Sequence, residues 1–129
     1  MQHHVLLALQ LPLPAFAALL GLLPLPIVAE DELSSQLSAA VHQLGDRNFA
    51  RRESASVLLS RAGRKALPEL ILAVNSGDAE VRERAFAIIE YVARTTRGEH
   101  AIAANDALTS LVGSEHAEVA RRARLRIAD

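Results

Sequence analysis

Apolar residues recur every three or four positions through most of this chain, and this spacing constrains the fold more than any other feature. Stripes of this kind follow one another at residues 33–44, 55–62, 67–74, 81–92, 101–111 and 119–127. Each stripe covers one face of a helix, as packing against neighbouring helices requires. No segment shows the alternation of a half-buried β-strand, so the sequence predicts an all-α fold.

Short breaks between the stripes contain residues that stop and start helices. Gly45 and Gly63 follow two of the stripes and are suited to end a helix. Asp46 or Asn48 is suited to cap the second helix, and Asp78 the fourth, by accepting backbone N–H bonds from the first turn. Because the connections are only about two to five residues long, we expect consecutive helices to be antiparallel neighbours in about three pairs.

The composition limits which residues can form the core and which chemistry the chain can perform. Aromatic residues make up only 3% of the chain, so the core must consist of Leu, Ile, Val and Ala, which favours close helix packing over a β-sandwich or barrel. The chain has no cysteine, which excludes disulfides and thiolate chemistry. Its net charge of −1 argues against a general binder of polyanions.

The first 29 residues differ from the rest of the chain. Residues 5–29 contain no charged side chain, and a segment of about 25 residues is long enough to span a bilayer. The apolar run 15–23 ends at Pro24 and Pro26, and the small Ala29 precedes an acidic cluster, which is the order of a signal peptide cleaved after Ala29. We therefore expect export to the periplasm, cell envelope or exterior. An uncleaved membrane anchor and a buried hydrophobic helix are the alternatives, and only residues 1–29 would contact a membrane.

Two short sequence matches indicate an internal repeat within residues 30–129. The sequence RESA at 52–55 recurs as RERA at 82–85, thirty residues later. The sequence DAEV at 78–81 recurs loosely as HAEV at 116–119, thirty-eight residues later. Each match falls at the start of the second helix of a predicted pair. A period of roughly 30–40 residues is typical of helix pairs stacked in one direction.

The repeated segments resemble a known family. ALPEL at 66–70 and DAEVRERA at 78–85 resemble the HEAT repeat, which has a proline early in its first helix and an Asp–Val–Arg start to its second. LGDRNFARRESA at 44–55 looks like the opening of another such unit. The resemblance covers about residues 33–128. This segment is similar in particular to short exported bacterial proteins built on the repeat. The resemblance implies a right-handed α-α superhelix, a HEAT-like solenoid of the armadillo-like helical kind, that binds other proteins.

The resemblance also implies a structural ladder. In the HEAT family, Asp and Arg at the start of the second helix often pair between neighbouring repeats. The residues of this chain at those positions are Asp46, Arg52, Asp78 and Arg82. The third unit has His116 and Ala120 instead, which suits either a terminal cap or a piece of a longer array.

No pattern in the sequence indicates catalysis. The five histidines do not have metal-ligand spacing, and no phosphate-binding glycine loop or GxSxG turn is present. Glu90 and Tyr91 are adjacent, so on a helix their side chains point about 100° apart and do not face one site. We therefore expect a protein that is not an enzyme and that uses no metal and no other cofactor.

Basic residues cluster in segments 47–65 and 121–126. If the second helices line the concave face, as in the HEAT family, a group of arginines shares one surface, namely Arg51, Arg84, Arg121 and Arg122. An acidic segment of a partner protein would suit this surface, and a solvated helix face is the alternative. Nucleic acid is disfavoured because the chain lacks the interleaved aromatic residues on which single-strand binders stack bases.

The sequence thus predicts a protein-interaction module that binds through its second-helix face. The alternatives are a membrane-tethered spacer, or a fragment of a longer scaffold, and HEAT-like repeats also occur in accessory subunits of lyases that attach chromophores. We expect Leu58 and Ile88 to lie in the core, where replacement by alanine costs roughly 2–5 kcal/mol.

Overall fold

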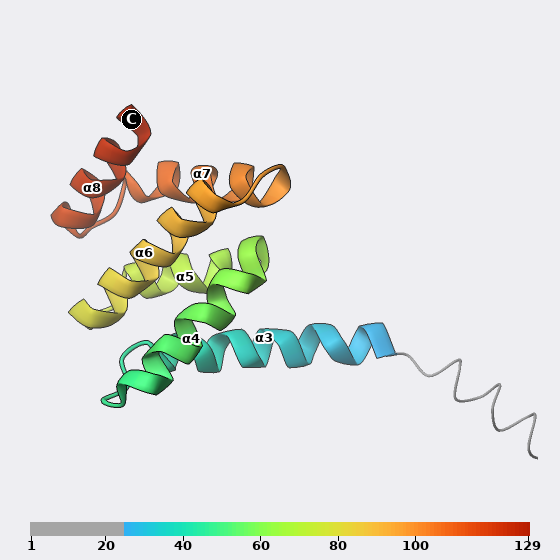
Figure 1. The fold of residues 1–129 in the computed structure, drawn as a ribbon. Coiled ribbons are helices and arrows are strands. Elements are labelled where there is room, and N and C mark those ends of the chain that lie inside the picture. The colour runs from blue at the N-terminus through green and yellow to red at the C-terminus, as the bar shows by residue number, and fades with distance from the viewer. Residues whose placement is uncertain (1–24) are drawn as a thin grey trace, which may run out of the picture. The chain divides into compact units, whose positions relative to one another are not determined.

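The computed structural model describes residues 25–129, with side chains from Glu30 onward, and this part of the chain is helical without any strand (Figure 1). The all-α prediction is therefore confirmed for these residues. The elements are α3 (Leu25–Gln43), α4 (Phe49–Ala62), the 3-10 turn η1 (Gly63–Ala66), α5 (Leu67–Val74), α6 (Ala79–Thr95), α7 (Glu99–Leu111) and α8 (Ala117–Ala128).

Most of the predicted signal peptide or membrane anchor lies outside the described residues. Helix α3 begins at Leu25 and continues past Ala29, the residue after which cleavage is predicted. None of the helices within residues 25–129 has both the length and the hydropathy of a membrane span. Residues Ser34–Asp129 form one compact unit, and the contacts described below lie within it.

Helices α4 and α6 begin with the capping that their sequences predict. The Oδ1 atom of Asn48 accepts two backbone N–H bonds from the first turn of α4, at 2.9 and 3.4 Å. The Oδ1 atom of Asp78 does the same for α6, at 2.9 and 3.2 Å. Asp46, the alternative cap of α4, instead accepts the backbone N–H of Asn48 at 2.8 Å. Each such cap satisfies N–H groups that a helix leaves without a partner.

Within residues 30–129, the core consists of aliphatic and alanine side chains and Phe86. The largest side chains that are fully buried are Phe86, Leu44, Leu59, Leu70, Ile89, Leu111, Val74 and Val92. The predicted core residue Ile88 is 5% exposed, but the prediction for Leu58 is wrong, because Leu58 is 39% exposed. Helix α4 buries Ala55 and Leu59, and Leu58 lies about 100° around the helix from Leu59.

Consecutive helices pack as pairs, and the pairs contact one another. Helix α5 packs on α6, α6 on α7, and α7 on α8. Contacts between α4 and α6, and between α5 and α7, join one pair to the next. Figure 1 shows α4, α6 and α8 running in a similar direction along one side of α5 and α7. Following the repeat pattern, we call α4, α6 and α8 the second helices.

Candidate functional site

The three second helices begin with equivalent turns, which gives them a common numbering. In each turn, the backbone N–H of the cap residue donates a hydrogen bond to a side-chain oxygen two residues earlier. The distances are 2.8 Å before Asn48, 3.2 Å before Asp78 and 3.2 Å before His116. Positions counted from these three cap residues can therefore be compared between α4, α6 and α8.

One ion pair recurs between neighbouring second helices. Arg84, six residues after the cap of α6, lies 3.1 Å from the carboxylate of Glu53, five residues after the cap of α4. Arg122 holds the equivalent position in α8, and its Nη1 lies 2.8 Å from the carboxylate of Glu83, the equivalent of Glu53 in α6. The same two positions thus meet at both junctions.

The junction of α6 and α8 contains a larger charge cluster. Glu90, with a side chain only 13% exposed, lies 2.9 Å from both Arg122 and Arg126. The contact from Arg122 Nη2 to Glu90 Oε1 has the distance of an ion pair without the alignment of a hydrogen bond. The guanidinium of Arg122 also lies 4.5 Å from the centre of the Phe86 ring, close enough for a cation–π interaction.

At the junction of α4 and α6, Glu80 contacts two arginines. Arg84 Nε donates to Glu80 Oε1 at 2.7 Å, and this hydrogen bond, opposed by desolvation and assisted by Glu53, raises the pKa of Arg84. Glu80 also lies 3.9 Å from Arg52 Nε. Arg84 therefore remains a cation with two carboxylate partners within the protein.

The hydrogen bonds of the predicted ladder residues lie within their own units. Arg52 Nη1 donates to the backbone carbonyls of Asp46 and Arg47, at 2.7 and 3.1 Å, and Arg82 Nη1 donates to the carbonyl of Ser76 at 2.8 Å. Each arginine thus ties its helix to the preceding loop. Asp78 caps α6, and the hydrogen bond from Asn48, followed by the charge of Arg51, lowers the pKa of the Asp46 carboxyl. Between units, Arg52 lies 3.9 Å from Glu80, and the Arg84–Glu53 and Arg122–Glu83 pairs add shorter links.

The four arginines of the predicted partner-binding face differ in their surroundings. Arg84 and Arg122 are occupied by the carboxylates described above, which the sequence analysis did not single out. Arg51 is exposed and lies 3.5 Å from Asp46. Arg121 is exposed and has no ion pair among the described residues. The thirty-residue recurrence of Arg-Glu at 52–53 and 82–83 was the sequence signal that could have pointed to Glu53 and Glu83.

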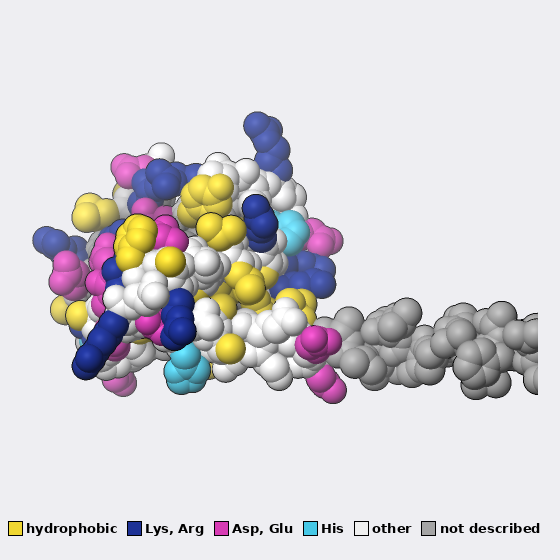
Figure 2. All heavy atoms as spheres, turned by 60° about the horizontal axis from the view of Figure 1, so that its bottom comes forward, with side chains coloured by type: hydrophobic (Ala, Val, Ile, Leu, Met, Phe, Trp, Pro, Cys, Tyr) yellow, Lys and Arg dark blue, Asp and Glu magenta, His cyan; other side chains and the backbone are white. Residues whose placement is uncertain are grey.

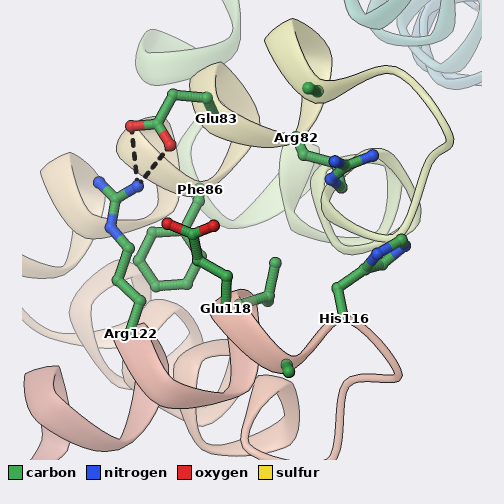
Figure 3. A pocket seen from close by; sticks show the side chains of 9 residues that line it. Arg82, Glu83, Phe86, His116, Glu118 and Arg122 are labelled. Atoms are coloured by element: carbon green, nitrogen blue, oxygen red, sulfur yellow. Dashed lines mark hydrogen bonds and ion pairs between the residues drawn. The ribbon is translucent and has the colours of Figure 1, made fainter.

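A hollow of about 350 Å³ lies between the first halves of α6 and α8. Figure 3 shows Arg82 and His116 on one side of it, the Glu83–Arg122 pair on the other, and Glu118 and Phe86 between them. Glu118 has no ion pair among the described residues, whereas Glu80, its equivalent in α6, forms an ion pair with Arg84. The hollow combines an apolar ring with both signs of charge. Its chemistry suits a small polar side chain, and residues 30–129 contain no cluster of His, Asp and Glu able to hold a metal ion.

An apolar row crosses the outer surface of the second helices. It consists of Val57, Ala87 and Leu125, each nine residues after its cap and each exposed. Val57 is 47% exposed and Leu125 60%. The space-filling view in Figure 2 likewise shows hydrophobic side chains scattered between charged ones on the visible face.

Comparison with protein-family models, curated proteins and solved structures finds no match for this chain.

Proposed function

We propose that this chain is a short HEAT-like solenoid module that binds a partner protein through the surface of its second helices. The observation that carries the proposal is the recurrence of one ion pair at both junctions, Arg84 with Glu53 and Arg122 with Glu83. A contact that repeats between equivalent positions is what a stack of equivalent helix pairs requires. Such a stack aligns equivalent side chains into rows, and a row of side chains can bind an extended partner.

The apolar row is the part of this surface suited to supply affinity. Val57, Ala87 and Leu125 are exposed to solvent at equivalent positions of α4, α6 and α8. When a partner covers these side chains, each Å² of buried apolar surface contributes about 25 cal/mol of favourable free energy. The paired charges beside the row, such as Arg84 with Glu53, are already fixed by contacts within the protein. They form a polar rim of the kind that surrounds the apolar centre of protein interfaces.

The charges of the surface favour a protein partner over nucleic acid. The carboxylates of Glu53, Glu80 and Glu83 lie beside the arginines of α6 and α8 and would repel a phosphate backbone. Arg61 and Arg121 have no carboxylate partner among the described residues, lie one helical turn from Val57 and Leu125, and suit acidic residues of a partner. The partner that fits is an apolar segment with acidic residues.

We also propose that the module is exported, with residues 1–29 as a signal peptide. The measurement is the intact mass and membrane partition of the protein expressed in a bacterial host. A soluble exported product that begins at Glu30 is the expected result. A full-length product in the membrane fraction would instead make residues 1–29 an anchor and the module a tethered one.

The binding proposal is tested with a displayed library of random peptides selected against the protein. Selected peptides should be apolar with acidic residues and should lose binding to the double variant Val57→Asp/Leu125→Asp. The matched control is Leu72→Asp/Ile102→Asp, which places the same charges on α5 and α7 at sites 69% and 63% exposed. Circular dichroism verifies that both variants are folded. Peptides that bind all three proteins equally, or a library without any binder, would refute the proposal.

A further inference from the structure

One face of α8 has the positions that receive a neighbouring second helix, yet no described element covers it. The position eleven residues after the cap is fully buried in α4 and α6, where it is Leu59 and Ile89, but the equivalent Ile127 is 50% exposed. The position four residues before the cap shows the same change, because Leu44 and Val74 are 0% exposed and Val112 is partly exposed. We call this uncovered surface the α8 end face.

The charges on the α8 end face can be compared with those at the equivalent positions of α6, which contact α8. On α6, Arg122 of the arriving helix meets Glu83, five residues after the cap, and Phe86, eight residues after it. On α8, the same two positions are Arg121 and Arg124, which are both exposed and have no ion pair among the described residues. A side chain that arrives at the equivalent place on α8 therefore meets two guanidinium groups. An arginine would be repelled there and a carboxylate attracted.

A second copy of this chain does not supply the required carboxylate. The helix that would arrive from another copy is α4, which has Ser54 at the position of Arg122. It also has the basic Arg61 one turn beyond its exposed Leu58. Stacking of copies end to end would thus bring an uncharged and a basic side chain to a basic face.

We propose that the α8 end face binds an amphipathic helix of a partner protein, with a carboxylate at the position equivalent to Arg122. The helix covers Ile127 with its apolar side, while its carboxylate lies between Arg121 and Arg124. This inference rests on the proposed stacking of repeats and specifies the chemistry of a partner at the end of the stack. It shares Arg121 with the surface beside the apolar row, but it needs neither Val57 nor Leu125.

The probe is a synthetic helix that copies α6, the 17-residue segment Ala79–Thr95, with Arg84→Glu. Arg84 is the residue of α6 equivalent to Arg122, so the substitution places the carboxylate where the proposal requires it. A hydrocarbon staple between positions 87 and 91, both exposed on α6, keeps the peptide helical, which circular dichroism verifies. The control probe is the same stapled peptide with Arg84 retained.

Fluorescence anisotropy then measures binding of each labelled peptide to the whole chain. We expect the Arg84→Glu peptide to bind about tenfold more tightly than the control peptide, which corresponds to about 1.4 kcal/mol. The preference should reverse for the protein variant Arg121→Glu/Arg124→Glu. It should persist for Arg94→Glu/Arg97→Glu, which makes the same change in net charge at two other exposed arginines without ion pairs.

Two results would overturn this proposal. Equal binding of the two peptides would show that no carboxylate is recognised, and an equal loss in the two charge-reversed proteins would show only general attraction. Because Val57 and Leu125 are unchanged in these variants, either result leaves the apolar row and its library test unaffected. Conversely, if the peptide library gave no binder to the apolar row, the expected affinity of the stapled peptide for the α8 end face would be unchanged.

Discussion

Replacing Leu59 with alanine is expected to lower the free energy of unfolding by about 3–4 kcal/mol. Leu59 is 0% exposed, and α4, the helix that carries it, packs against α6 and η1. The substitution removes three buried carbon atoms, each contributing about 0.8 kcal/mol of transfer free energy, or about 2.4 kcal/mol together. The remainder comes from the cavity, because helices joined by short loops cannot move in to fill it completely.

The neighbouring Leu58 provides the matched control for this experiment. It is 39% exposed, so its replacement by alanine loses fewer contacts and leaves a space that water can enter. We expect a loss of about 1 kcal/mol or less for Leu58→Ala. Urea unfolding of both variants and the parent protein, monitored by circular dichroism, measures the difference. Equal losses for the two variants, or a larger one for Leu58→Ala, would show that the opposite side of α4 faces the core and would refute this reasoning.

Two other perturbations test local features of the fold. Gly63 and Gly98 have φ of 58° and 61°, but a Cβ added at Gly63 meets the ring of His100 and one added at Gly98 meets nothing within 4 Å. Gly63→Ala should therefore lower the midpoint of thermal unfolding by about 5 °C more than Gly98→Ala, and equal midpoints would contradict the contact. Asp46→Asn should destabilise the protein near neutral pH and have no effect in strong acid. The lowered pKa of Asp46 means that its carboxylate adds stability above the unfolded pKa, and this stability is lost as the pH falls through the folded one. Urea unfolding at about pH 7 and about pH 2 measures this, and a difference that persists in acid would assign the effect to something other than charge.

The local elements of this protein could be predicted because local interactions determine them. The apolar period of three and four residues places the helices, since it is the spacing of one helical face. Asn48 and Asp78 cap α4 and α6 because their short side chains reach N–H groups only two and three residues later. Such contacts depend on neighbours in the sequence and need no knowledge of the tertiary structure.

The candidate site could be predicted only in part. Arg84 and Arg122 were predicted to share one surface, and the structure places them at equivalent positions of α6 and α8. Glu53 and Glu83 were missed because Glu53 is 31 residues from Arg84 and Glu83 is 39 residues from Arg122. Which pairs meet over such separations depends on the displacement between neighbouring helices, and periodicity along one helix carries no information about it.

By itself, the sequence determined the helical class of the described residues, the positions of the breaks and the cap of α6, and it limited the cap of α4 to Asp46 or Asn48. Tertiary structure alone decided which of two adjacent leucines is buried, since Leu58 and Leu59 are equally apolar and the rotation of α4 against α6 separates them. It also decided that Arg52 and Arg82 donate hydrogen bonds to their own loops, and that Arg84 and Arg122 form ion pairs with neighbouring helices. The physical reason is that helix formation depends on hydrogen bonds over four residues, whereas burial and ion pairing between helices depend on how whole helices pack.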